Sequence, residues 1–213
     1  MIKEIELVEG FFWPREGGKG CREVTIIRHE TPQKISAHCK NKNVVISAGA
    51  NVGFYIKKYA EIFKKVYAFE PEPVNFHCLD LNVKEENVLK IHGALGDKIE
   101  KVGLSKHCDD SGAWRVANGP RHPTDLPTQF SQEQDVQIYR IDDLKLDDLD
   151  LIALDVEGFE LKVLQGAVGT IKKHKPIISV EANFFTDACQ FLCDINYIKI
   201  DEVNGDWVYK SNE

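Results

Sequence analysis

The sequence predicts an α/β fold built on a mainly parallel β-sheet. From Asn43 onward, short runs rich in β-branched and aromatic residues alternate with segments whose apolar residues recur at helical spacing, and this alternation is typical of βαβ units. A glycine-containing turn, SAGANVG, separates the first such run from the first helical segment. Glycines at this point let the backbone approach a ligand closely, beside the unpaired N–H groups of a helix N-terminus.

The elements follow in order. The first half contains three expected strands and two expected helices: strands Val44–Ser47, Val66–Phe69 and Val88–His92, and helices Val52–Phe63 and Pro71–Leu81. In the first helix the apolar residues are spaced i, i+3, i+4, i+7, and in the second the prolines suit a first helical turn. The second half contains strands Val136–Ile141, Leu149–Val156 and Pro176–Glu181. After the strand at Leu149–Val156, the apolar residues recur at helical spacing at Leu161, Leu164, Val168 and Ile171. A further helix is expected over Phe184–Cys193. Tyr197–Ile200 and Trp207–Tyr209 are expected to close the sheet as a hairpin over Asn204-Gly205.

Two segments do not fit this pattern. Residues 1–42 include FFWPREGGKG, which we interpret as a flap or lid, with a poorly ordered leader as the alternative. Residues 98–134 hold three glycines and three prolines, and so long an irregular insertion is usually functional or mobile. The expected organisation is a flap over 1–42 and one domain over 43–213, with the 98–134 insertion above its site.

Composition restricts the class of protein. The chain of 213 residues has 43% hydrophobic and 29% charged residues and a formal net charge of −7, which is ordinary for a globular domain and argues against nucleic acid as the main partner. No apolar run is long enough for a membrane span, and the first residues do not resemble a signal peptide. The six cysteines form no C-x-x-C pair, so reduced thiols and a cytoplasmic location are expected.

The glycine turn and a downstream acid point to one kind of ligand. Gly49 and Gly53 form G-x-x-x-G, which lacks the middle glycine that admits a dinucleotide pyrophosphate. Glu70 ends the second strand, where an acid is placed to accept both hydroxyls of a ribose. An acidic residue placed to bind a ribose, without a site for a pyrophosphate, indicates an adenosine ligand with a short zwitterionic tail. S-adenosylmethionine is such a ligand.

The same residues carry a family resemblance. SAGANVGFYIKKYA, VYAFEPEPVNF, GALGD, IDDL, LIALDVEGFELKVLQGA and KPIISVE run from about Val44 to Glu181. With them, the chain resembles the FkbM family of S-adenosylmethionine-dependent methyltransferases. The specific part is D-V-E-G-x-E followed by L-x-G-A. The resemblance implies the class I methyltransferase fold, a seven-stranded mostly parallel sheet with helices on both faces and an antiparallel C-terminal hairpin.

The resemblance also implies roles for individual residues. Gly49, Asn51 and Gly53 would lie along the methionine portion of the cofactor, and Glu70 would hold the ribose. Ala94 and Leu95, with Asp97 nearby, would border the adenine. Asp155 and Glu157 would face the transferred methyl group.

One position departs from the family pattern. Ser47 stands where the family usually has an aspartate that helps to hold the ammonium group of the cofactor. A serine accepts a hydrogen bond but supplies no charge, so weaker cofactor binding or a member without activity are both consistent with it.

The expected chemistry requires few groups. The sulfonium is already activated, so the protein must align an acceptor hydroxyl and help to remove its proton. We expect Asp155 or Glu157 to do this, with capping of the following helix as the alternative for Glu157. Asp155 and Glu157, with Glu181 or Asn183, could also supply oxygen ligands to a metal ion, but no spacing requires one and no metal is predicted.

The sequence therefore predicts an O-methyltransferase that acts on a hydroxyl of a carbohydrate or a similar small natural product. The second hypothesis is a catalytically inactive binding module with the same fold. It is supported by Ser47, which replaces the aspartate usual in the family. A nucleic-acid methyltransferase is disfavoured by the acidic balance. Nucleic acid and membrane are not expected partners, and a homodimer is left open.

Overall fold

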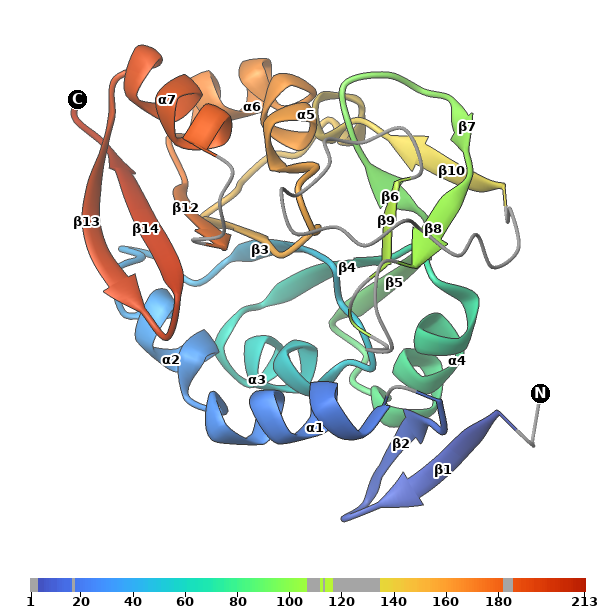
Figure 1. Cartoon of the computed structure of the whole chain (residues 1–213). Helices are drawn as coiled ribbons and strands as arrows, with labels where there is room; N and C mark the ends of the chain where they lie inside the picture. Colours follow the sequence, from blue (N-terminus) through green and yellow to red (C-terminus); the bar gives the residue numbers. More distant parts are fainter. Residues whose placement is uncertain (1–3, 17, 107–111, 113, 117–134, 182–185) are drawn as a thin grey trace.

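A seven-stranded sheet forms the centre of the molecule (Figure 1). The computed structural model describes residues 4–16, 18–106, 112, 114–116, 135–181 and 186–213. The strands lie in the order β13–β14–β12–β11–β3–β4–β5. Their bounds are β3 (Val44–Ala48), β4 (Lys65–Glu70), β5 (Val88–His92), β11 (Leu151–Leu154), β12 (Ile177–Glu181), β13 (Tyr197–Val203) and β14 (Asp206–Ser211). The five strands from β12 to β5 are parallel and β14 is antiparallel to both neighbours, so the predicted fold class is confirmed.

Helices cover both faces of this sheet (Figure 1). One face carries α1 (Gly18–Ile27), α2 (Thr31–Ser36), α3 (Phe54–Ile62) and α4 (Pro73–Asn82), and the other carries α5 (Glu160–Gln165), α6 (Val168–His174) and α7 (Thr186–Asp194). Val45 packs toward the α3 face and its neighbour Ile46 toward the α5 face, and both are fully buried. Strands buried on both faces are continuously apolar, which explains the uninterrupted VVIS and LIAL runs.

The predicted C-terminal hairpin is present. β13 and β14 pair in antiparallel register across Asn204-Gly205, and both turn residues have positive φ, 53° and 98°. Such a two-residue turn matches the right-handed twist of the strands. The hairpin places Asp206 opposite Glu181 on β12.

The segment after β11 forms two helices, α5 and α6. The sequence had suggested one continuous run of helical spacing there. The break between α5 and α6 falls at Gly166, where a Cβ atom would overlap the carbonyl oxygen of Gly96. Asp142 then accepts hydrogen bonds from the backbone N–H groups of Gly169 (3.2 Å) and Thr170 (2.8 Å) in the first turn of α6. Because Gly166 lies so close to Gly96 and Asp142 caps the first turn of α6, α6 begins as a separate helix.

Small sheets flank the main one near the insertion. β6 (Ala94–Leu95), β10 (Val136–Tyr139) and β7 (Lys101–Val102) form one, and β8 (Leu104–Lys106) and β9 (Trp114–Val116) form the other. The expected strand over 136–141 ends at Tyr139, because Ile141–Leu144 forms a 3-10 helix.

The described part of residues 1–42 forms a hairpin and two helices. β1 (Ile5–Val8) and β2 (Phe11–Pro14) pair with each other, and the Asn82 side chain joins them to α4 through hydrogen bonds with the Phe12 backbone (2.7 and 2.8 Å). Trp13 is 1% exposed and packs with Phe11 and Phe54. Trp13 therefore contributes to packing rather than to a sugar-binding surface.

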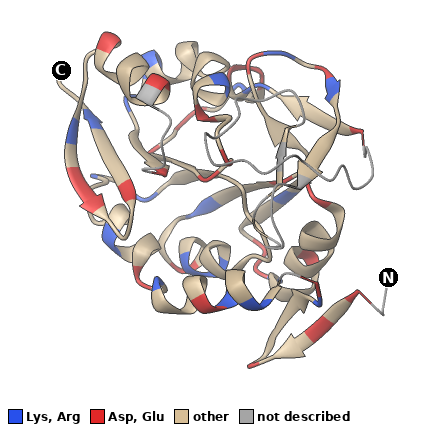
Figure 2. Ribbon diagram, viewed as in Figure 1, with Lys and Arg blue, Asp and Glu red and all other residues tan. Residues whose placement is uncertain are grey.

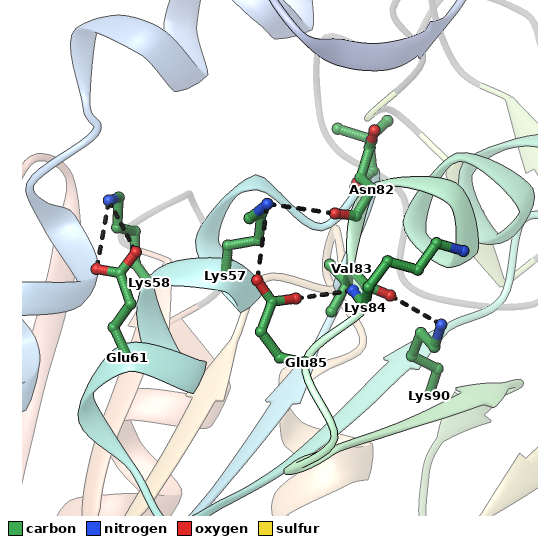
Figure 3. Close-up of polar contacts among 9 residues, drawn as sticks. Lys57, Lys58, Glu61, Asn82, Val83, Lys84, Glu85 and Lys90 are labelled. Carbon is green, nitrogen blue, oxygen red and sulfur yellow. Dashed lines mark hydrogen bonds and ion pairs between the residues drawn. The ribbon is translucent and has the colours of Figure 1, made fainter.

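Charged side chains on the helices are mixed in sign, with Lys and Arg interspersed among Asp and Glu (Figure 2). Figure 3 shows one such group, in which Lys57 on α3 contacts Glu85 (3.6 Å) and the Asn82 carbonyl, and Lys90 contacts the Val83 carbonyl. These contacts link α3, the end of α4 and β5. In the part of the chain that the structure describes, no helix has both the length and the apolar character needed to cross a membrane.

Candidate functional site

A cavity of about 320 Å³ opens at the carboxyl ends of β3, β4 and β11. Its walls come from α1, the turn after β3, the end of β4, β6, the β8–β9 pair and the loop after β11. The carboxyl edge is where open α/β sheets bind ligands, and the volume is within the range of small-molecule sites. Parts of both irregular segments therefore reach the site: Cys21, Val24, Thr25 and Arg28 from the first, and Leu104, Gly112, Trp114 and Val116 from the second.

The turn after β3 is held in place by backbone contacts. The N–H groups of Gly49 and Ala50 both donate to the Phe69 carbonyl of β4 (3.0 and 2.9 Å). Gly49 has φ 82°, and a Cβ atom there would overlap the carbonyl oxygen of Asp155. Glycine is therefore required for the turn to lie directly against the loop after β11.

Glu70 lies beneath this turn. Its carboxylate accepts the N–H of Asn51 (2.7 Å) and that of Glu72 (2.9 Å), and the side chain is 4% exposed. Burial raises the pKa of Glu70 to about 7, while the hydrogen bonds from Glu72 and Asn51 act in the opposite direction. Glu70 both orders Asn51, which has φ 50°, and lines the cavity.

Ala94 and Leu95 form an apolar part of the wall, with Phe69, Trp114 and Phe159 also lining the cavity. This surface fits a flat, weakly polar group such as a purine ring. It lies in the same cavity as Glu70.

Ser47 faces a second, smaller cavity of about 80 Å³. This cavity adjoins the first, because Gly49, Asn51 and Asp155 line both. Its other polar walls come from distant parts of the chain: Arg28, Tyr55, Ser179 and Asp206.

Three carboxylates meet where the two cavities join. Asp155, Glu157 and Glu181 each offer an oxygen, and these oxygens lie within 4.8 Å of one another. Positive φ at Glu157 (54°) and Gly158 (98°) turns the chain, so Glu157 comes back to the side of Asp155. Asp155 is the most exposed of the three, because it faces the open space of the cavity. The protein groups around it displace part of its water, and this desolvation, followed by the charges of Glu181 and Glu157, raises the pKa of Asp155 above its ordinary value.

Two residues expected at the site lie elsewhere. Gly53 is the N-cap of α3 with φ 90°, and a Cβ atom there would meet Val83 and Leu79 of the α4 region. Asp97 forms an ion pair with Lys162 of α5 (2.8 Å). Neither is among the described residues that line the two adjoining cavities, and their contact with the cofactor stays a prediction.

Some residues at the site were not identified from the sequence. Arg28 and Asp206 belong to segments without a recognisable binding motif, whereas Tyr55 lies on the helix that follows the glycine turn, and only the fold brings the three together. Glu160, in the first turn of α5, accepts the N–H of Gly158 (3.2 Å) in the loop before the helix. Three further candidates lie outside the described residues: Asn183, named above as a possible oxygen ligand, and the insertion histidines His107 and His122, either of which could act as a base.

The arrangement suits a nucleoside with a charged tail. Glu70, Gly49, Asn51, Ala94 and Leu95 all line the same cavity, so a carboxylate, an apolar wall and a glycine turn face one space. The far end of such a ligand would reach the three carboxylates.

Comparisons with known proteins agree with this geometry. A family model described as the methyltransferase FkbM domain matches residues 47–201. Methyltransferase sdnD of Sordaria araneosa is 26% identical over 168 residues, covering 61% of this chain and 62% of that protein. Methyltransferase 1 of Beauveria bassiana (strain ARSEF 2860) is 25% identical over 144 residues and covers 57% of each chain. The chain thus matches less than two thirds of the length of these curated relatives.

A solved structure shares the fold. The crystal structure of methyltransferase FkbM from Methylobacillus flagellatus KT matches with a TM-score of 0.55 and 19% identity, covering 79% of this chain and 43% of that one.

Proposed function

Because the chain belongs to the FkbM methyltransferase family, we propose that it transfers a methyl group from S-adenosylmethionine to a hydroxyl group of a carbohydrate or a similar small acceptor. The observation that carries this proposal is the joint placement of Glu70, the Gly49 turn and Asp155 around one cavity. Family and fold support S-adenosylmethionine as the cofactor. The acceptor class is our inference from the walls of the site.

Cofactor binding is assigned to the residues that line the two cavities. Glu70 would accept the ribose hydroxyls, and Ala94 and Leu95 would border the adenine. Gly49 and Asn51 would contact the methionine portion, with Ser47 beside them in the second cavity. A carboxylate that already holds Asn51 in place would bind the ribose without further ordering of the turn.

Asp155 and Glu157 would act on the acceptor. In the transfer, the C–S bond of the sulfonium breaks with its electron pair left on sulfur, and the acceptor oxygen forms the new O–C bond. The hydroxyl proton must leave, and Asp155, which faces the cavity, would be the carboxylate that accepts it. Alignment of the oxygen with the methyl group would supply the rest of the acceleration.

The second cavity supports a polar acceptor. Its walls hold Arg28, Tyr55 and Asp206 beside Asp155, so donors and acceptors of hydrogen bonds surround the space next to the reacting methyl group.

An inactive module with the same fold is the second candidate, because Ser47 supplies no charge for the ammonium group of the cofactor. Calorimetry with S-adenosylmethionine and S-adenosylhomocysteine tests the shared premise, and we expect saturable binding of both. Transfer of a labelled methyl group to a panel of glycans and small hydroxyl compounds then separates the two candidates. Absence of cofactor binding at millimolar concentration would overturn the proposed enzyme.

A further inference from the structure

We propose that Asp155, Glu157 and Glu181 bind a divalent hard cation, such as Mg²⁺ or Mn²⁺, at the junction of the two cavities. The sequence alone did not predict a metal site, because nothing in the spacing of these residues requires one. The chemical role that we give to the cation rests on the proposed methyl transfer, whereas its binding can be tested independently.

The fold forces the three carboxylates together. β11 and β12 are adjacent parallel strands in register, with Leu154 opposite Val180. The next residue on each strand is an acid, Asp155 and Glu181, so both side chains emerge at the same edge of the sheet. The turn at Glu157 and Gly158 adds the third carboxylate, and one oxygen from each lies within 4.8 Å of the others.

Among the described residues, two buried carboxylate oxygens near this loop have no hydrogen-bond partner. Glu160 is 2% exposed, and its Oε1 accepts the N–H groups of Val156 (3.3 Å) and Gly158 (3.2 Å), which flank Glu157. Its Oε2 is buried without a hydrogen-bond partner, and so is the Oε2 of Glu181. The charges of Glu160 and Glu181 act on each other and on Asp155. An unpaired buried carboxylate oxygen is costly, and a cation with its bound water would supply the missing partner.

The ligand set determines the kind of cation. Three carboxylates provide only hard oxygen ligands, which suit Mg²⁺, Mn²⁺ or Ca²⁺ rather than a soft metal. Asp155 and Glu181 line both cavities, so the remaining coordination positions face space that water or an acceptor hydroxyl can occupy. Protonation of the carboxylates is the competing way to relieve their repulsion.

A cation at this place would change the role of Asp155 from base to ligand. A hydroxyl group bound to the cation loses its proton more readily. The proton would pass to solvent water, and the oxygen would then attack the methyl carbon while the C–S electron pair stays on sulfur. The cation would also fix the position of the acceptor oxygen.

The test is a titration of the full chain with Mn²⁺ at pH 7.5, followed by electron paramagnetic resonance of the free ion. We expect one saturable site from which Mg²⁺ displaces Mn²⁺. Glu181→Gln and Asp155→Asn should each weaken Mn²⁺ binding at least tenfold. The control is Glu61→Gln on α3, whose carboxylate contacts Lys58 away from the cavities (Figure 3), and its Mn²⁺ affinity should equal that of the unmodified chain.

Absence of saturable Mn²⁺ binding, or unchanged affinity in Glu181→Gln, would overturn the site. Circular dichroism of each variant establishes that it is folded, and the Asp155→Asn result stands if Glu181→Gln does not fold. Binding of S-adenosylhomocysteine is measured in parallel with EDTA present. Loss of that binding in the unmodified chain would count against the proposed function and would leave the Mn²⁺ result intact.

Discussion

At the scale of a single residue, Glu70 both orders the glycine turn and lines the cavity. It ends β4 as a buried acid and holds the N–H of Asn51 at 2.7 Å, so the same carboxylate orders the turn and faces the cavity. Its position at the end of the second strand was predicted from spacing alone. Its bond to Asn51 was not, because the left-handed backbone at Asn51 depends on tertiary contacts.

Replacement of Glu70 tests its contact with the ribose. We expect Glu70→Ala to weaken binding of S-adenosylhomocysteine by about 1–3 kcal/mol, the usual loss for hydrogen bonds to a charged group. Isothermal titration calorimetry measures this change, with the exposed Glu61→Ala as the matched control. Equal affinity in the two variants would remove Glu70 from the cofactor site.

Asp155→Asn tests the chemistry rather than the cofactor. The amide keeps the shape of the side chain but can neither accept the proton nor bind a cation as strongly. We expect turnover of an identified acceptor to fall by about 10²–10⁴-fold, with S-adenosylhomocysteine bound as tightly as before. Full activity in this variant would show that Asp155 takes no part in the reaction.

At the scale of elements, the backbones of two sequence motifs, VLQGA and GALGD, are in direct contact. Gly166 of VLQGA lies against the Gly96 carbonyl of GALGD, and Asp142 of IDDL caps α6. From its sequence alone, the acidic run over 142–150 would be expected to be a solvated approach to the strand that follows it. The structure instead uses its acids as partners of backbone N–H groups, since Asp150 also accepts those of Asn43 and Val44.

Asp142→Ala tests the cap. Asp142 accepts the Thr170 N–H and hydroxyl, both at 2.8 Å, and the Gly169 N–H. Its loss should lower the free energy of unfolding by about 1–2 kcal/mol, as for other N-terminal caps, without a change in cofactor affinity. Asp143→Ala is the control in urea denaturation, because Asp143 is half-exposed and makes only an ion pair with Arg140. Equal losses in the two variants would contradict the cap.

At the scale of the whole molecule, the sheet was predictable and the junction of the cavities was not. Buried strands and amphipathic helices leave local patterns, so all seven strands of the main sheet were located to within a few residues. The meeting of Glu181 with Asp155 depends on which strands are neighbours, which is not a local property. Helix α1 was missed because GKGCREVTII contains two glycines and several β-branched residues of low helix propensity, and its packing compensates.

The pH dependence of stability follows from the burial of Glu70. The pKa of Glu70 is about 7 in the folded chain, against an ordinary value of 4.5. Between these values the folded chain keeps a proton that the unfolded chain has lost. The free energy of unfolding should therefore fall as the pH rises from about 4.5 to about 7, by up to about 3 kcal/mol from this group, and then level off.

Urea denaturation at several pH values between 5 and 8 measures this loss, and Glu70→Gln should remove the part due to Glu70. Curves for the two proteins that run parallel across this range would contradict the raised pKa. Glu61→Gln serves again as the control, because its carboxylate is exposed.

The second cavity joins opposite ends of the chain. Arg28 lies near the N-terminus and Asp206 on the last strand, and both line it. The first cavity also depends on distant segments, because the Gly49 turn rests against Asp155 of the loop after β11. Neither cavity is therefore complete in a chain that ends before β11, and the second also needs β14 between β12 and β13. A nascent chain would have to leave the ribosome almost entirely before the methyl donor and its acceptor could meet.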